Sequence, residues 1–246
     1  MKPEPRPGSA DETVEHITSF LVSELKITEI LAGSTQEGGY RAEHKTDRIV
    51  LSLFGTEVSK RRSRERLTEL DAILLAEGNT TAEERLVRIL AERRMTICTA
   101  ESCTGGMIAT RITDVPGSSR VFWGGFVVYE NEAKRNILGI RSVEQFGAVS
   151  SEVVTEMASR AVEKSGTDVS IAVSGIAGPG GGTDEKPVGT VYIGIGRLGR
   201  PSRSYRIYVS GDRDRVRRRT TLTCLLLATG EVLEKNIDTD ILSNYI

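Results

Sequence analysis

Residues 96–113 read TICTAESCTGGMIATRIT, and this stretch defines the architecture of the domain that contains it. Thr96 to Thr99 form a short apolar run typical of a strand, and Gly106 to Thr113 are predicted to form a helix. Small and polar residues fill the loop between these two elements. A strand that leads through a tight loop into a helix is the basic unit of α/β domains, so the stretch predicts a layered α/β fold.

Strands and helices alternate in the same way from residue 79 to the C-terminus. Thr80 and Thr81 precede Glu83 and Glu84 at the spacing of a capping box, which predicts a helix that ends at Arg94. Further strands are predicted at 121–129, 169–173, 190–195 and 205–209, helices at 131–138 and 151–164, a loop at 175–189 and a closing helix capped by Asp212. Because the strands are apolar on both faces, the predicted fold class of residues 79–246 is a three-layer α/β/α domain.

Residues 1–78 differ in composition and are predicted to form a small α+β extension. Lys2 to Ala10 are rich in proline, glycine and serine and are expected to be a mobile tail. Apolar spacing predicts helices at 11–25 and 57–77 and a strand at 49–54, with a polar, turn-rich segment at 33–45.

The overall charge gives no reason to expect a nucleic-acid partner. The 246 residues include 33 Lys and Arg against 34 Asp and Glu, with a formal charge of −1 and a pI near 6.2. No global field therefore attracts a polyanion. The basic run from Lys60 to Arg66 is a local candidate for nucleic acid, but Glu57, Glu65, Glu69 and Asp71 surround it, which favours a solvated helix face.

The sequence has the features of a soluble protein from a reducing compartment. Its longest aliphatic run, Leu225 to Ala228, is far shorter than the roughly 20 residues that span a bilayer. The N-terminal MKPEPRPGSADET lacks an apolar segment, so no secretory signal is expected. Cys98, Cys103 and Cys224 form neither an even set nor a CxxC pair, which favours a cytoplasmic location.

Both histidines, His16 and His44, lie in the extension, and this excludes several mechanisms from residues 79–246. A Ser-His-Asp triad, a Cys-His dyad and a histidine-based zinc site cannot be built there. Carboxylates alone can still hold Mg²⁺, but no Asp/Glu pair stands at a strand end beside the glycine-rich loops, so no metal and no cofactor are expected. The sequence lacks GxxxxGK[ST]. Its G-x-G-x-x-G at Gly194, Gly196 and Gly199 precedes a strand, where a dinucleotide site needs a helix, and this indicates a hairpin turn.

Two loops rich in small residues follow predicted strands, SCTGG at 102–106 and SGIAGPGGG at 174–182. Small residues let a backbone approach a ligand closely, and the N–H groups at a helix N-terminus favour an anion such as a phosphate. Two ordinary glycine-rich surface turns are an equally good interpretation of these residues alone.

Ser102 lies where a strand ends, a position at which a strand-to-helix turn can expose a hydroxyl as a nucleophile. Without a histidine it needs another base. Tyr129 and Lys134 follow a predicted strand and can project from the same rim of the sheet, and a desolvated lysine can lose its proton near neutral pH. Ser-Lys pairing is a known catalytic solution, although a lysine in a charged helix is more often simply solvated.

Six motifs in order make the chain resemble a known family. They are TAESCTGG at 99–106, PGSS at 116–119, GGFVVYENEAK at 124–134, GAVSSEVV at 147–154, SGIAGPGGGTDEKPVGTVY at 174–192 and SGDRDRVR at 210–217. Together they resemble the CinA C-terminal family, the nicotinamide-nucleotide amidohydrolases or NMN deamidases. The resemblance implies an α/β/α fold and an enzyme of pyridine nucleotide salvage. Such an enzyme hydrolyses nicotinamide mononucleotide to nicotinate mononucleotide and ammonia, without a metal in this domain.

The resemblance also implies roles for individual residues. It makes Ser102 the nucleophile and Lys134 the general base, acting directly or through Tyr129. Backbone N–H groups near Thr104 to Gly106 are expected to stabilise the oxyanion. The expected substrate-binding residues are Thr104, Gly105 and Gly106 in the first loop, Ser174, Gly175, Ala177 and Gly178 in the second, which hold the ribose and phosphate, and Arg213 as a further phosphate candidate. Arginines near 213 are also common in a solvated first turn or a subunit contact.

The resemblance covers about residues 79–246 and leaves the remainder open. Full-length relatives carry an N-terminal domain similar to molybdopterin-binding proteins and associated with a pyrophosphatase, and no such activity is expected here. RLTELDAILLAEGNTTAEERL at 66–86 is similar to the connector before the deamidase module. A homodimer is expected by analogy and from the apolar closing helix at Leu222 and Leu225–Leu227, although this face can instead pack on its own sheet. The competing function is a non-catalytic nucleotide-binding or regulatory protein of the same fold.

Overall fold

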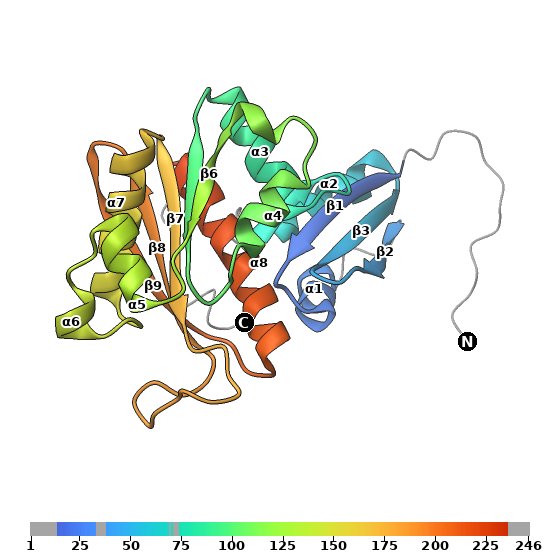
Figure 1. Ribbon diagram of the computed structural model, residues 1–246. Coiled ribbons are helices and arrows are strands. Elements are labelled where there is room, and N and C mark those ends of the chain that lie inside the picture. Colours follow the sequence, from blue (N-terminus) through green and yellow to red (C-terminus); the bar gives the residue numbers. More distant parts are fainter. Residues whose placement is uncertain (1–13, 33–37, 69, 71–73, 236–246) are drawn as a thin grey trace. The chain divides into compact units, whose positions relative to one another are not determined.

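The computed structural model describes residues 14–32, 38–68, 70 and 74–235 (Figure 1). The tail expected at Lys2–Ala10 lies outside these residues. The chain divides into two compact units, unit 1 (Met1–Thr80) and unit 2 (Thr81–Ile246). Unit 2 contains all the candidate site residues.

Unit 2 is built on a five-stranded sheet of order β6-β5-β7-β8-β9. The strands are β5 (Ile97–Glu101), β6 (Phe122–Val127), β7 (Val169–Gly175), β8 (Thr190–Arg197) and β9 (Arg200–Tyr208). Strands β6, β5 and β7 run parallel, β8 pairs antiparallel with β7, and β9 pairs antiparallel with β8. Because β6 is an edge strand, Trp123 and Val127 are exposed, so the expectation of a strand buried on both faces was wrong there.

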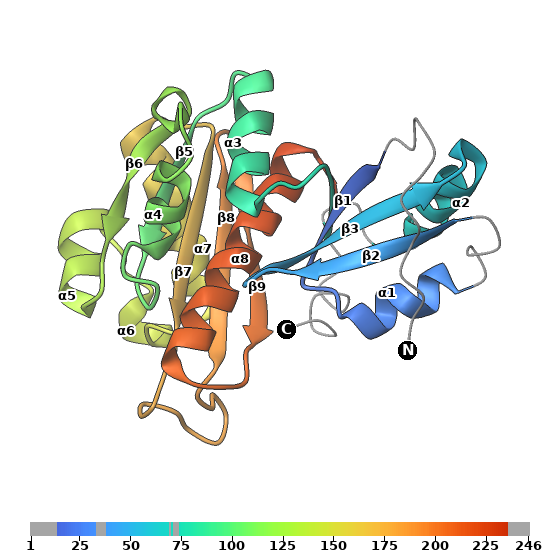
Figure 2. The same ribbon diagram turned by 90° about the vertical axis from the view of Figure 1, so that its right-hand side faces the viewer.

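Helices cover both faces of this sheet, which confirms the predicted three-layer α/β/α fold (Figures 1 and 2). One layer contains α3 (Ala82–Glu92), α4 (Met107–Thr113) and α8 (Arg213–Val232). The other contains α7 (Ser151–Ser165) together with α5 (Asn131–Ala133), the π-helical turn η3 (Lys134–Leu138) and α6 (Val143–Phe146). A 3-10 turn, η2 (Ser118–Arg120), precedes β6. Fully buried Ala100, Met157 and Ala172 fill the space between α7 and the sheet.

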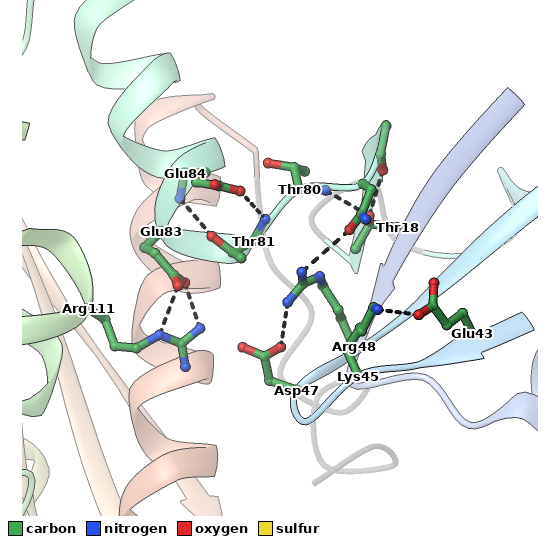
Figure 3. Close-up of polar contacts among 12 residues, drawn as sticks. Thr18, Glu43, Lys45, Asp47, Arg48, Thr80, Thr81, Glu83, Glu84 and Arg111 are labelled. Atoms are coloured by element: carbon green, nitrogen blue, oxygen red, sulfur yellow. Dashed lines mark hydrogen bonds and ion pairs between the residues drawn. The ribbon is translucent and has the colours of Figure 1, made fainter. Parts of the chain in front are cut away.

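Capping side chains start the helices of unit 2 where the sequence predicts them. The Thr81 hydroxyl accepts from the N–H of Glu84 at 3.2 Å, and the Glu84 carboxylate accepts from the N–H of Thr81 at 2.7 Å (Figure 3). The Asp212 carboxylate accepts from the N–H of Arg215 at 2.8 Å at the start of α8. Arg111 of α4 pairs with Glu83 of α3 at 2.6 Å and joins these two helices.

Helix α8 buries its apolar face within the chain. Leu222, Leu225, Leu226 and Leu227 are at most 1% exposed, and α8 packs against β7, β8, α3 and α4. The expectation that these leucines form a dimer contact was therefore wrong, because they have no exposed surface to offer. Over the described ranges, no helix combines the length and apolar character needed to cross a membrane.

The G-x-G-x-x-G motif lies in the β8–β9 hairpin, which confirms the hairpin interpretation. Gly199 occupies the turn with φ +73°. The other two glycines serve helix packing. A Cβ at Gly194 would overlap the carbonyl oxygen of Val154, and a Cβ at Gly196 would lie 2.8 Å from the carbonyl oxygen of Ala158, both in α7. The motif lets α7 approach β8 closely.

We expect Gly194→Ala to destabilise unit 2 by about 1–3 kcal/mol, because an added methyl must displace the α7 backbone. Chemical denaturation followed by circular dichroism measures the change. Gly180→Ala is the matched control, since a Cβ at Gly180 meets nothing within 4 Å. Equal free energies of unfolding for the two variants would contradict the packing explanation.

Unit 1 is a four-stranded antiparallel sheet of order β2-β3-β1-β4 with two helices. Its elements are β1 (Glu15–Phe20), α1 (Glu24–Leu31), β2 (Gly38–His44), β3 (Arg48–Gly55), α2 (Glu57–Leu67) and β4 (Leu75–Glu77). This βαββαβ order is the ferredoxin-like arrangement. Thr18 joins β1 to the end of the unit, since its hydroxyl donates to the Gly78 carbonyl at 2.6 Å and accepts from the N–H of Thr80 at 3.2 Å (Figure 3).

Three of the elements predicted for residues 11–77 were wrong. The helix at 11–25 is β1 over Glu15–Phe20, because pairing with β3 and β4 buries Ile17 to Phe20, whereas Val14 and Leu25 are exposed. The turn-rich segment at 33–45 contains the edge strand β2. The helix at 57–77 ends at Leu67, and β4 begins at Leu75. For β1 and β4, pairing between distant strands overrides a short local pattern, whereas β2 forms a hairpin with the adjacent β3.

The basic run in α2 is largely paired within unit 1. Lys60 is 3% exposed and pairs with Glu57 at 2.5 Å, and Arg61 pairs with Glu65 at 2.9 Å. Arg64 pairs with Glu15 at 3.0 Å, and Arg66 donates to the carbonyls of Ile30 and Ala32. These contacts favour a structural helix face over a nucleic-acid patch.

Candidate active site

The three parallel strands of unit 2 end at one edge of the sheet. Glu101, the last residue of β5, lies beside Val127 of β6 and Val173 of β7. Ser102, Tyr129 and Ser174 follow or lie near these strand ends, and the N–H of Ser102 donates to the Val173 carbonyl at 3.1 Å. Candidate residues far apart in the sequence therefore meet at this edge, where α/β sheets commonly bind ligands.

A pocket of about 190 Å³ opens at this edge. Seven of the predicted site residues line it, namely Ser102, Tyr129, Lys134, Ser174, Gly175, Ala177 and Arg213. Thr104, Gly105, Gly106 and Gly178 are absent from its lining. The pocket is also lined by four residues that were not predicted as site residues from the sequence: Cys103, Asn131, Ala148 and Val149. Each lies inside or beside a motif already quoted, so proximity to those motifs was the available signal.

Ser102 and Lys134 form a hydrogen-bonded pair inside the pocket. The Nζ of Lys134 donates to the Oγ of Ser102 at 3.2 Å and to the backbone carbonyl of Tyr129 at 2.9 Å. Lys134 begins η3 and is 1% exposed, and Ser102 is 8% exposed. The alternative interpretation of Lys134 as a solvated lysine was therefore wrong, because the side chain is buried.

Burial of this amine lowers the pKa of Lys134 below its usual 10.5, against the opposing effects of Glu130 and Cys103. A lysine with a depressed pKa is neutral more often at physiological pH, and only the neutral amine can accept a proton. The neighbouring thiol behaves in the opposite way. Burial raises the pKa of Cys103 to about 12, so this thiol stays protonated and does not compete with Ser102 as a nucleophile.

The backbone carbonyl of Tyr129 accepts a hydrogen bond from Lys134, whereas its phenol bonds to a different residue. The guanidinium of Arg213 donates to the phenol oxygen of Tyr129 at 3.1 Å and to the carbonyl of Gly178 at 2.9 Å. Tyr129 is 54% exposed. Of the two expected routes for the proton, the structure shows the contact needed for the direct one, because Lys134 reaches Ser102 at 3.2 Å.

The loop after β5 is held by the protein itself. The N–H of Gly105 donates to the Ser102 carbonyl at 3.1 Å, and the N–H of Gly106 donates to the Glu101 carboxylate at 3.0 Å. The side chain of Glu101 therefore occupies the helix N-terminus at which a phosphate was expected. The oxyanion role expected of the Gly105 and Gly106 amides was also wrong. In the described part of the chain, the N–H groups of Cys103 and Thr104 have no hydrogen-bond acceptor.

The second loop contributes a polar group that has no partner. Ser174 is 1% exposed and lines the pocket, and its hydroxyl has no hydrogen-bond partner among the residues described. A buried hydroxyl of this kind can bond a ligand at little cost, because it gives up no protein contact. Across the same residues, no group of three or more His, Cys, Asp and Glu side chains is placed to hold a metal ion.

Comparison with known proteins finds the same family over the same residues. The family described as "CinA C-terminal domain" matches residues 79–231. A CinA-like protein of Akkermansia muciniphila is 41% identical over 218 residues, which cover 85% of this chain and 53% of that protein. A CinA-like protein of Geobacter sulfurreducens is 47% identical over 165 residues, or 66% of this chain and 39% of that protein. The chain thus spans about half the length, or less, of these relatives. The first alignment is longer than unit 2 and extends into unit 1.

Solved structures resemble unit 2. A CinA superfamily protein from Klebsiella pneumoniae is 32% identical with a TM-score of 0.60, and the match covers 62% of this chain and 96% of that one. A competence/damage-inducible protein from Agrobacterium tumefaciens is 38% identical with a TM-score of 0.57, covering 61% of this chain and 97% of that one. Chains of about the size of unit 2 therefore occur on their own.

Proposed function

Because the chain belongs to the CinA C-terminal domain family, we propose that it is an amidohydrolase that converts nicotinamide mononucleotide to nicotinate mononucleotide and ammonia. The observation that carries the proposal is the buried pair of Ser102 and Lys134 at 3.2 Å, in a pocket that contains no histidine. A serine hydroxyl beside a desolvated amine is a nucleophile with its base.

The first step forms an acyl-enzyme. Neutral Lys134 accepts the proton of the Ser102 hydroxyl, and Oγ attacks the carboxamide carbon of the substrate. The carbonyl π electrons move onto the oxygen, where the N–H groups of Cys103 and Thr104 are the available donors. The tetrahedral intermediate collapses, the C–N bond breaks, and the ammonium of Lys134 protonates the leaving nitrogen, so that ammonia departs.

The second step consumes a water molecule. Neutral Lys134 accepts a proton from water, and the resulting hydroxide attacks the ester carbon bound to Ser102. Collapse breaks the C–Oγ bond and Lys134 returns its proton to Oγ. The product is released as the carboxylic acid, which loses its remaining proton to solvent and becomes the carboxylate. Each proton that Lys134 accepts is delivered again within the same step, so no metal-bound water is required.

The rim of the pocket suits the phosphate of the substrate. Arg213 lines the pocket, and among the residues that the structure describes its guanidinium donates to a phenol and a carbonyl and pairs with no carboxylate. An unneutralised arginine beside the glycine-rich loop is the group that a phosphate monoester prefers. The buried hydroxyl of Ser174 is available for the ribose or the carboxamide.

We expect Arg213→Gln to raise KM for nicotinamide mononucleotide about 10- to 100-fold, the effect of one lost charge-assisted hydrogen bond. The same variant should leave kcat/KM for nicotinamide riboside, which lacks the phosphate, unchanged. Steady-state kinetics on both substrates measure the difference. Arg215→Gln, one half-turn away and bonded to the Ser210 carbonyl outside the pocket, is the control. Equal losses on both substrates would contradict phosphate recognition by Arg213.

The experiment that tests the proposed function is ammonia release from nicotinamide mononucleotide by purified protein in the presence of a chelator. Nicotinamide and the dinucleotide NAD are compared under the same conditions. Release from the mononucleotide alone supports the proposed substrate. Tight binding of the mononucleotide without release would instead favour the non-catalytic regulatory protein. A homodimer and a cytoplasmic location stay predictions, and a dimer would need a surface other than the buried leucines of α8.

A further inference from the structure

Glu101 is a buried carboxylate that the steps above do not use. It is the last residue of β5, it is fully buried, and it directly precedes Ser102. Its Oε2 accepts from the Thr104 hydroxyl at 2.7 Å and from the N–H groups of Gly106 and Ile108 at 3.0 Å each. Its Oε1 accepts from the N–H of Ala109 at 2.8 Å.

These four donors all follow Ser102 in the chain, whereas Glu101 precedes it. The carboxylate therefore closes a ring of contacts around the nucleophile, from the residue before it to the first turn of α4. Two further bonds hold this loop from outside, from the N–H of Ser102 to the Val173 carbonyl and from the Arg217 guanidinium to the Thr104 carbonyl at 2.7 Å. The loop that carries Ser102 is therefore held by hydrogen bonds with β7, α4 and α8.

The choice of a carboxylate has a chemical explanation. Both oxygens of Glu101 accept, so a glutamine would present an NH₂ group to at least one donor and lose that bond. No Lys or Arg side chain in the described ranges pairs with Glu101, and its partners are donors of the loop and helix that follow it. A side chain with two accepting oxygens therefore suits this cluster of four donors.

We propose that Glu101 is a positioning residue for the nucleophile. It holds residues 102–106 so that the Ser102 hydroxyl meets Lys134 while the N–H groups of Cys103 and Thr104 stay free for the carbonyl oxygen of the substrate. By accepting the N–H groups of Gly106, Ile108 and Ala109, it also excludes a substrate phosphate from the start of α4. This inference rests on the proposed function, since it assigns Glu101 to the same reaction.

The test compares Glu101→Gln with Glu156→Gln. Glu156 is a matched control because its carboxylate also accepts backbone N–H groups, those of Arg141 and Ser142, and it does not line the pocket. We expect Glu101→Gln to lower kcat about 100-fold, as a misplaced reacting group does, with KM unchanged. Glu156→Gln should leave both constants unchanged. Thermal unfolding verifies that each variant is folded.

A second readout does not depend on the natural substrate. The Oγ of Ser102 can displace fluoride from an alkyl fluorophosphonate and form a stable phosphonyl ester, which mass spectrometry locates. We expect the labelling rate of Ser102 to fall in Glu101→Gln in parallel with kcat. Should Glu101→Gln fail to fold, Thr104→Val replaces it, because this variant removes one donor and retains the carboxylate. It should show a smaller loss of kcat and of labelling.

The outcomes separate this inference from the proposed function. A folded Glu101→Gln that keeps the wild-type kcat and labelling rate overturns the positioning role, and so does an equal loss in Glu156→Gln. If the wild type labels at Ser102 but releases no ammonia from the mononucleotide, the proposed substrate fails and the labelling rates still decide the role of Glu101. If Ser102 does not label in the wild type, the nucleophile and this inference both fail.

Discussion

Ser102→Ala should abolish ammonia release from nicotinamide mononucleotide, with a fall in kcat on the order of 10⁴- to 10⁶-fold, as for other serine nucleophiles. The Oγ of Ser102 is the hydroxyl oxygen to which Lys134 donates, and Ser174, the other serine in the pocket, makes no such bond. An alanine leaves the pocket walls in place, so binding of the mononucleotide should persist. Kinetics and isothermal titration calorimetry measure the two effects separately.

The control for this variant is Ser170→Ala. Ser170 is a fully buried serine of β7 whose hydroxyl donates to the Ala158 carbonyl at 2.7 Å, away from the pocket. Its loss should reduce stability by about 1 kcal/mol and leave kcat unchanged. Ammonia release by Ser102→Ala at the wild-type rate would refute the proposed mechanism, whatever the family of the protein.

The second large effect is expected at Lys134. Lys134→Met keeps a chain of similar length without an amine and should lower kcat about 10²- to 10⁴-fold, the usual contribution of a general base. Lys134→Arg should not restore activity, because a guanidinium stays protonated and cannot accept the Ser102 proton. An active Lys134→Arg enzyme would show that this side chain supplies only a positive charge.

The pH dependence of the wild type follows from the lowered pKa of Lys134. The amine must be neutral to act, so kcat/KM should rise with pH through this pKa, which lies below 10.5, and then level off. Between the lowered pKa of Lys134 in the folded protein and 10.5 in the unfolded chain, the unfolded state binds the additional proton. Stability relative to Lys134→Met should therefore rise with pH across this window. A flat difference in the free energy of unfolding would argue against a buried amine.

Unit 2 was more predictable from sequence than unit 1 because its elements are long and locally marked. The Thr81 capping box, the Asp212 cap and the apolar stripe of α7 are patterns within a few residues, and each is found as predicted. In unit 1, β2 forms a hairpin with the adjacent β3, whereas the hydrogen bonds of β1 go to β3 and β4, many residues further along the chain. A local pattern cannot report such pairing, which is why a helix was predicted where β1 forms.

The candidate site divides in the same way. Ser102, Lys134 and the absence of histidine between residues 79 and 246 can be read from the order of residues alone, and they already require a serine nucleophile to use a base other than histidine. Three contacts of the site are visible only in the tertiary structure. Lys134 is buried and bonds to Ser102, 32 residues earlier in the chain, Glu101 accepts from the amide of Gly106, and Arg213 donates to the phenol of Tyr129. Composition and spacing record which groups exist and which short-range bonds they can make. Packing between distant segments decides which groups form hydrogen bonds within the protein and which amines are buried from solvent. Only the tertiary structure therefore contains that information.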